Sequence, residues 1–290
     1  MPTATIDGVE LYYEVTGEGE PLVWSHEFAG DHRSWAPQVR AFARRYRVIT
    51  YSNRGYHPST VPEDPAAYSQ ERLVDDLRGL LRHLGIARAH VGGLSMGGSV
   101  ALNFALTYPE MCRGVVVAGC GSGSDDPETF RAGGRQLIGT IEREGMAAFA
   151  EVYAVGPTRR QLLRKDPQGW REFHDQLAEH SSRGSALIFA NVQLKRPTVY
   201  QLEPRLRACT VPLLVVVGDE DEPCLAPGLF IKLQVRSAGL AILPATGHTL
   251  NLEEPELFNR LVLDFLTAVE QGRWPVREAE ATAQAAERLF

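Results

Sequence analysis

The stretch Gly93-Leu94-Ser95-Met96-Gly97 places a glycine two residues before and two residues after a serine. It follows a short strand-like run, Ala89–Gly92, and precedes a predicted helix, Ser99–Tyr108, that ends at Pro109. A chain that turns this sharply from strand to helix strains the serine backbone, and a Cβ at either glycine would collide with neighbouring atoms. The pattern G-x-S-x-G in this context predicts an exposed nucleophilic serine, Ser95, whereas a glycine-rich turn without chemistry is the simpler alternative.

Strand-sized apolar runs alternate with amphipathic helical stretches over most of the chain. This alternation favours an α/β fold with a parallel, doubly wound sheet and helices on both faces. The predicted strands are Val9–Thr16, Leu22–Trp24, Tyr46–Tyr51, Ala89–Gly92, Gly114–Ala118, Pro212–Gly218 and Leu240–Leu243, and the predicted helices are Trp35–Arg45, Ser69–Leu84, Ser99–Tyr108 and Asn259–Glu270.

The alternation stops between residues 121 and 208, where the sequence predicts helices and no strand. We therefore expect residues 1–120 and 209–270 to form one core, residues 121–208 to form an inserted helical unit, and residues 271–290 to add a C-terminal helical extension. The predicted helices of the insertion are Glu128–Glu144, Met146–Tyr153, Arg159–Lys165, Gly169–His180, Ser185–Val192 and Glu203–Arg207.

Composition narrows the class of protein. The 290 residues are 44% hydrophobic and carry a net charge of −6, which excludes wholesale disorder and argues against a nucleic-acid partner. No apolar run approaches the roughly 18 residues of a membrane span, and the first residues lack the pattern of a secretion signal. The four cysteines form no CxxC pair. We therefore expect a cytoplasmic protein with free thiols, without a metal ion or cofactor and without a membrane partner.

A serine hydroxyl needs a base, and that base needs a carboxylate to orient it. Among eight histidines, His248 lies in a loop after the strand Leu240–Leu243, at the sheet edge where Ser95 is expected. The loop Gly218-Asp219-Glu220-Asp221-Glu222 follows another strand and offers the acid. Spacing favours Asp221, with Asp219 second and Glu222 third.

The order serine, acid, histidine, with the motifs GLSMG, GDED and GH, resembles the α/β-hydrolase superfamily over about residues 5 to 270. The amino-terminal half is most similar to enol-lactone hydrolases and related esterases. This resemblance implies a mostly parallel, eight-stranded sheet, a helical cap over the active site, and no cofactor. The matching stretches are Trp35–Val39, Tyr46–Tyr51, Arg54-Gly55 and Gly93–Gly98.

The resemblance also implies an oxyanion hole built from the backbone N–H groups of Phe28 and Met96. Here the sequence departs from the family pattern, because Glu27 follows His26 where a glycine is usual. Glu27 either points away into a salt bridge or solvent, or enters the site as a second acid/base or a contact for a cationic substrate group. We expect His26 to fix this loop through hydrogen bonds.

Several side chains are candidates for the pocket wall, although for the aromatic residues of the cap, packing within the cap is an equally good explanation. Cys224 follows the acid loop and is expected to border the pocket without a reactive role. The candidates are Glu27, Trp35, Tyr153, Trp170, Phe189 and Leu250.

These features predict a serine hydrolase, of the carboxylic ester hydrolase or lactonase type, that cleaves a small or medium apolar ester, lactone or thioester. One alternative is non-hydrolytic or carbon–carbon bond-cleaving Ser/His chemistry, as in a lyase, a cofactor-free oxygenase or a perhydrolase. Another is a ligand-binding protein on a hydrolase scaffold. The expected partner is a small-molecule substrate, and the C-terminal extension leaves a homodimer contact open.

Overall fold

The computed structural model describes residues 2–278, which contain one eight-stranded sheet in the order β1-β2-β4-β3-β5-β6-β7-β8. β2 pairs antiparallel with β1 and β4, and the other neighbouring strands run parallel. The carboxyl ends of β3 and β5–β8 therefore meet at one edge. The strands are β1 (Thr3–Ile6), β2 (Val9–Thr16), β3 (Glu20–Ser25), β4 (Tyr46–Tyr51), β5 (Ala89–Leu94), β6 (Cys112–Ala118), β7 (Leu213–Gly218) and β8 (Ala238–Leu243).

Alternate residues of the central strands pack into two apolar layers, one on each face of the sheet. Val115 and Val117 of β6 pack into one layer, and Val116 packs into the other. This period of two, with both faces apolar, is what a sheet covered on both sides requires. The first layer is covered by α2 (Gln70–His83), α3 (Met96–Thr107) and α9 (Glu222–Gln234), and the second by α1 (Ala36–Phe42) and α11 (Pro255–Glu270).

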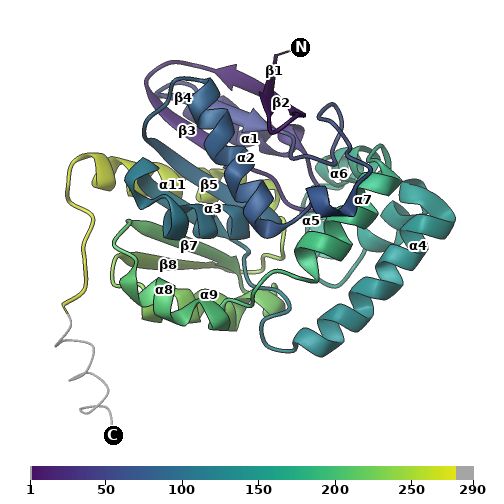
Figure 1. Cartoon of the computed structure of the whole chain (residues 1–290). Coiled ribbons are helices and arrows are strands. Elements are labelled where there is room, and N and C mark those ends of the chain that lie inside the picture. Colours follow the sequence, from purple (N-terminus) through teal and green to yellow (C-terminus); the bar gives the residue numbers. More distant parts are fainter. Residues whose placement is uncertain (1, 279–290) are drawn as a thin grey trace, which may run out of the picture.

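Five α-helices and a short 3-10 helix, Tyr200–Leu202, lie between β6 and β7 and form a helical insertion, called the cap below, most of which gathers beyond one end of the sheet (Figure 1). Its longest helix bends at Gly145, whose φ of 82° and ψ of 175° are not helical. The cap helices are α4 (Pro127–Tyr153), α5 (Arg160–Lys165), α6 (Pro167–Ala178), α7 (Ser182–Ile188), which continues as a π-helical turn over Phe189–Gln193, and α8 (Glu203–Ala208).

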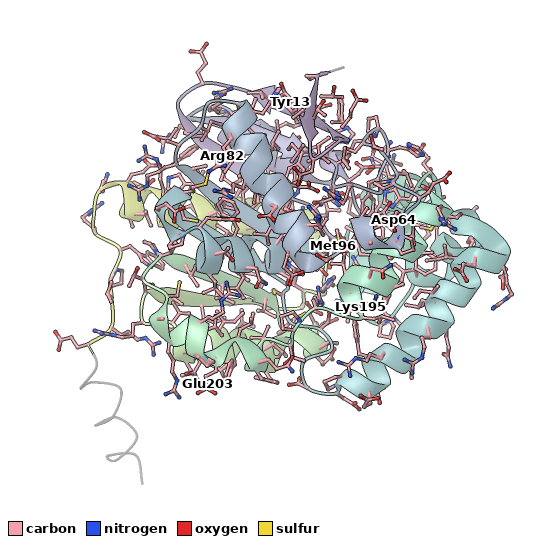
Figure 2. All side chains as sticks on the ribbon, viewed as in Figure 1. Tyr13, Asp64, Arg82, Met96, Lys195 and Glu203 are labelled. Carbon is pink, nitrogen blue, oxygen red and sulfur yellow. The ribbon has the colours of Figure 1, made fainter. Side chains whose placement is uncertain are left out.

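The predicted fold class is confirmed, although several elements differ from the prediction, among them α10 (Leu250–Glu253), which was not predicted, and α11, which begins at Pro255 rather than Asn259. β1 was not predicted, because it is four residues long. Helix α9 was also not predicted, since it contains Pro223 and Pro227 and lacks a clear apolar stripe. Helix α3 begins directly after Ser95 rather than at Ser99 (Figure 2 labels its first residue, Met96).

The C-terminal extension is described only in part. The residues after Gly272 that the structure describes are not helical, and residues 279–290 lie outside the described part of the chain. Trp274 packs its ring against Phe265 and donates a hydrogen bond to the Ser237 carbonyl at 2.7 Å. Among residues 2–278, no helix is long and apolar enough to cross a membrane.

Candidate active site

Ser95 sits on the turn between β5 and α3 with φ of 57° and ψ of −111°, a conformation that a non-glycine residue rarely adopts. The flanking glycines permit this turn. A Cβ on Gly93 would lie 2.1 Å from the Gly97 carbonyl oxygen, and a Cβ on Gly97 would lie 2.0 Å from the Ser25 carbonyl oxygen. The Ser95 N–H donates to the Ala118 carbonyl at 2.9 Å, so the turn is fastened to the end of β6. Such local strain is typical of a functional position.

The segment after β3 lies against the start of α3, as the close approach of Ser25 to Gly97 indicates. Tyr56 donates its hydroxyl to the Phe28 carbonyl at 2.9 Å and so holds the Phe28 peptide in place. Met96 is the first residue of α3, and the first N–H groups of a helix have no partner within the helix. The geometry is therefore compatible with the predicted oxyanion hole formed by Phe28 and Met96 N–H groups.

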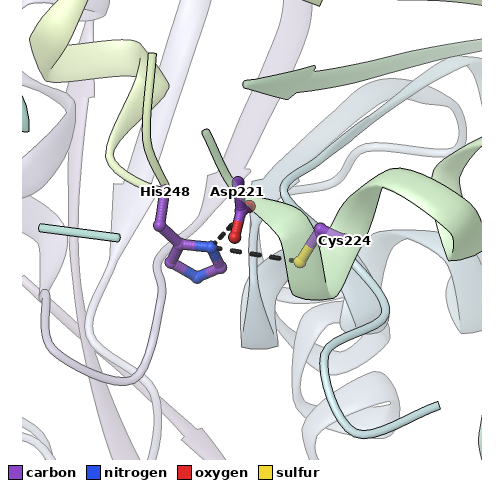
Figure 3. Close-up of side chains that lie close together, drawn as sticks. All are labelled: Asp221, Cys224 and His248. Atoms are coloured by element: carbon purple, nitrogen blue, oxygen red, sulfur yellow. Dashed lines mark hydrogen bonds and ion pairs between the residues drawn. The ribbon is translucent and has the colours of Figure 1, made fainter. Parts of the chain in front are cut away.

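Asp221 and His248 form a buried pair at the same sheet edge (Figure 3). The His248 Nδ1 and Asp221 Oδ2 atoms are 2.7 Å apart, and the two residues are 7% and 1% exposed, respectively. A Cβ on Gly119 would lie 3.5 Å from both Asp221 Oδ2 and His248 Cε1. The Ser95 N–H is hydrogen bonded to the carbonyl of Ala118, the residue before Gly119. The Asp221–His248 pair therefore lies beside the turn that carries Ser95.

The electrostatics keep Asp221 ionised. Burial alone would raise the pKa of this carboxyl. The charge of His248 and its hydrogen bond lower the pKa by more than burial raises it, so the net pKa lies below the usual value. An ionised Asp221 accepts a hydrogen bond from the Nδ1–H group of His248, which leaves Nε2 free to act as a base.

Of the three carboxylates that the sequence left open, Asp221 is the one hydrogen bonded to His248. Asp219 accepts a hydrogen bond from the Thr246 N–H at 3.0 Å, and Glu222 is an exposed residue at the start of α9. Asp219 therefore shapes the histidine loop without touching the imidazole.

Cys224 of α9 lies beside this pair (Figure 3). Its thiol donates to the Gly119 carbonyl at 3.3 Å and its sulfur is 4.0 Å from His248 Nδ1. Atoms of Asp221, Cys224 and His248 lie within 4.8 Å of one another, a spacing that a metal ion needs. However, burial raises the pKa of the Cys224 thiol well above its usual range, and a protonated thiol is a poor ligand. The cluster therefore fits an acid–histidine pair better than a metal site.

Glu27 forms a buried bidentate ion pair with Arg159 of the cap. Arg159 Nη1 and Nη2 donate to the two Glu27 oxygens at 2.8 and 2.5 Å, and Nη2 also donates to the Tyr153 hydroxyl at 3.1 Å. Burial would raise the pKa of Glu27, but the charge and hydrogen bonds of Arg159 outweigh it and the net pKa is lowered. Of the two roles considered, this geometry agrees with the salt bridge, because Arg159 donates to both carboxylate oxygens of Glu27.

The histidine loop is held by residues to which the sequence analysis assigned no role. Glu253 accepts hydrogen bonds from the Gly247 N–H at 2.7 Å and the Thr249 N–H at 3.1 Å, on either side of His248. The His248 N–H donates to the carbonyl of Thr158 in the cap at 2.9 Å. No local pattern marks Thr158 or Arg159, although an unusual carboxylate such as Glu27 signals that a cation lies nearby.

His26 agrees with its predicted loop-fixing place. The Asn53 N–H donates to its Nε2 at 2.9 Å, so Nδ1 carries the proton and donates to the Glu27 carbonyl at 2.7 Å. Burial lowers the pKa of His26 to about 4, which keeps the ring neutral.

The candidate pocket residues divide into two groups. Phe189 and Tyr153 lie near the Phe28 ring, with centroid distances of 4.9 and 6.1 Å. In contrast, Trp35 stacks on Trp24 at 4.4 Å within the apolar layer on the opposite face of the sheet, and Leu250 belongs to the same layer. Trp35 and Leu250 therefore pack in the core layer on that face of the sheet.

Trp170 packs within the cap. Its indole N–H donates to the Ala154 carbonyl at 2.8 Å and its ring stacks on His174. These contacts give Trp170 a structural place, without a contact to the site residues named above.

A family model described as "Alpha/beta hydrolase family" matches residues 22–261. The chain is 27% identical to 3-oxoadipate enol-lactonase 2 of Acinetobacter baylyi, over 90% of this chain and 94% of that protein. It is 29% identical to a putative 2-succinyl-6-hydroxy-2,4-cyclohexadiene-1-carboxylate synthase of Bacillus subtilis, over 91% and 97% of the two chains. A malate-bound thermophilic esterase from Thermogutta terrifontis matches with a TM-score of 0.83 and 27% identity, over 92% and 98%.

Proposed function

Because the chain belongs to the alpha/beta hydrolase family, we propose that it is a serine hydrolase acting on an ester, lactone or thioester through an acyl-enzyme on Ser95. The observation that carries this proposal is the strained Ser95 turn beside the buried Asp221–His248 pair. The similarity to an enol-lactonase and an esterase supports the ester or lactone class.

In the proposed reaction, His248 Nε2 removes the Ser95 proton as the oxygen attacks the substrate carbonyl. The backbone N–H groups of Phe28 and Met96 stabilise the resulting oxyanion. His248 then protonates the leaving alkoxide or thiolate, and the carbonyl re-forms as an ester of Ser95. A water molecule, deprotonated by His248, hydrolyses this ester and restores the free serine. Asp221 remains ionised throughout and stabilises the imidazolium.

The acyl part of the substrate is proposed to be apolar near the reacting carbonyl. Ser95 is 7% exposed, and the Phe149 and Phe189 rings lie at centroid distances of 6.1 and 4.9 Å from the ring of Phe28, whose N–H is the proposed oxyanion donor. A roofed, aromatic site favours a small or medium acyl group and excludes bulk water.

Turnover of p-nitrophenyl acetate tests the acyl-enzyme. We expect a burst of one p-nitrophenolate per chain before the steady state, and its loss in both Ser95→Ala and His248→Ala. Turnover without a burst that survives Ser95→Ala would reject the acyl-enzyme.

The similarity to a putative synthase gives the second candidate, a proton-transfer or carbon–carbon bond-cleaving reaction at the same residues. That reaction depends on His248 as a base more than on Ser95 as a nucleophile. Activity on a carbon acid that is lost in His248→Ala and retained in Ser95→Ala would favour it over the hydrolase.

A further inference from the structure

A second cavity lies one helical turn beyond the nucleophile. Ser99, the residue one turn after Ser95 on α3, lines this cavity together with Cys120, which follows Gly119 of the catalytic edge. Four residues of helix correspond to about 6 Å between the Ser95 and Ser99 backbones. The cavity is therefore close enough for the far end of a short substrate.

A row of aromatic rings connects the proposed oxyanion hole to this cavity. The Phe28 ring, at the proposed oxyanion hole, contacts Phe189 edge to face at 4.9 Å. Phe189 stacks on Phe130 at 6.2 Å, and Phe130 lines the second cavity. An apolar chain of a few carbon atoms would follow this row from Ser95 to the cavity.

The cavity holds an arginine without an acidic partner. The Arg196 side chain is partly exposed and also borders an outer hollow, but its Nη1 atom is shielded from solvent and lacks a hydrogen-bond partner within residues 2–278. Its Nη2 atom donates to the Ser122 carbonyl at 3.2 Å. The residues that line the cavity include Arg131 as a second cation and no carboxylate. Burial lowers the pKa of Arg196, and electrostatic interaction with the thiols of Cys120 and Cys224 opposes this shift.

A guanidinium nitrogen that is buried without a hydrogen-bond partner, such as Arg196 Nη1, is unfavourable unless an acceptor completes it. Planar N–H pairs of arginine match the two oxygens of a carboxylate. We propose that Arg196 binds a carboxylate at the distal end of the acyl group, so that the substrate is an ester or lactone carrying a carboxylate a few carbon atoms from the reacting carbonyl. This inference rests on the proposed hydrolase function for the position of the reacting carbonyl.

Two esters of equal acyl length test this specificity: p-nitrophenyl valerate, which is neutral, and mono-p-nitrophenyl glutarate, which ends in a carboxylate. We expect the wild type to prefer the glutarate ester in kcat/KM. In Arg196→Met, the ratio of charged to neutral kcat/KM should fall by about 10- to 100-fold, because a hydrogen bond to a charged group is lost. Arg196→Lys keeps the charge without the planar fork and should lie between the two.

Lys195→Met is the matched control. It removes the same charge from the adjacent residue, which is exposed on the segment after α7 (Figure 2). Both Lys195 and Arg196 border an outer hollow, but only Arg196 also lines this cavity. We expect the ratio to stay within about 2-fold of the wild type, whereas an equal fall in both variants would show a general charge effect and overturn the proposal.

A binding measurement separates this proposal from the hydrolase function. Calorimetry of glutarate with Ser95→Ala needs no turnover, and we expect binding that weakens at least 10-fold when Arg196→Met is added. Absence of glutarate binding, or binding unaffected by Arg196→Met, would overturn the carboxylate site even if ester hydrolysis were established. The melting temperature of Arg196→Met should not fall, because a buried nitrogen without a hydrogen-bond partner is removed; a marked fall would assign Arg196 a structural role instead.

Discussion

At the scale of single residues, the site depends on which nitrogen of His248 carries a proton. Asp221 accepts from Nδ1 at 2.7 Å, and this contact leaves Nε2 as the base. The same contact distinguishes Asp221 from its neighbours in the acid loop, which lie two residues or fewer away in sequence. A local pattern therefore identified the loop, and the hydrogen bond identifies the residue.

Asp221→Asn tests this assignment. An amide that donates to Nδ1 would hold the wrong tautomer, so we expect kcat for ester hydrolysis to fall by about four orders of magnitude. Asp219→Asn is the control, because Asp219 is hydrogen bonded to the Thr246 backbone, and we expect it to change kcat by less than about tenfold. A larger loss in Asp219→Asn than in Asp221→Asn would contradict the assignment.

A second feature at this scale is the ion pair between Glu27 and Arg159. It joins the segment after β3 to the cap. Glu27→Gln leaves Arg159 buried without its counter-charge, so we expect the free energy of unfolding to fall by about 3 kcal/mol in urea denaturation. The double variant Glu27→Gln/Arg159→Met should recover most of this loss, since it removes the unpaired charge as well. A double variant less stable than the single one would show that the two residues act independently.

The same pair predicts a dependence of stability on pH. The folded-state pKa of Glu27 lies below its unfolded value, which is about 4.3. The stability that it contributes is therefore complete above the unfolded pKa and is lost as pH falls through the folded pKa. From about pH 5 downward, the wild type should lose more unfolding free energy than Glu27→Gln/Arg159→Met. Parallel pH curves for the two proteins would contradict this account.

At the scale of elements, local sequence predicted most of the sheet and the cap. Alternating and continuous apolar runs identified seven of the eight strands, because burial on one or both faces leaves a mark in the sequence itself. The missed helix α9 has prolines where the pattern needs helix formers, so tertiary packing against β7 and β8 maintains it. The Arg159 and Thr158 contacts join segments more than 85 residues apart in sequence, and no local pattern encodes such pairings.

The break in α4 gives a prediction at this scale. Gly145 has φ of 82° and ψ of 175°, a region open essentially to glycine alone, although there is space for a Cβ. Gly145→Ala should therefore lower the free energy of unfolding by about 1–3 kcal/mol through backbone strain. Gly133→Ala lies in the exposed helical part of α4 with open space around it and should stabilise by about 0.5–1 kcal/mol. Equal effects of the two changes in urea denaturation would reject a special conformation at Gly145.

At the scale of the whole molecule, the proposed active site is assembled from both sides of the insertion and from the insertion itself. Ser95 precedes the cap in sequence, Asp221 and His248 follow it, and Thr158 of the cap accepts the His248 N–H. The cap is thus tied to His248, the proposed base, through a backbone hydrogen bond and to the segment after β3 through Glu27. We expect changes in the cap to alter catalysis as well as substrate choice, because the cap contacts both segments.

The most direct test of the central claim is covalent labelling by a fluorophosphonate probe, followed by mass spectrometry of the intact chain and its peptides. The account predicts one probe per chain, attached to Ser95, no labelling of Ser95→Ala, and labelling of His248→Ala slowed by at least about 1,000-fold, because the hydroxyl is a poor nucleophile without its base. Attachment at another residue, or labelling of Ser95 at an unchanged rate in His248→Ala, would contradict it.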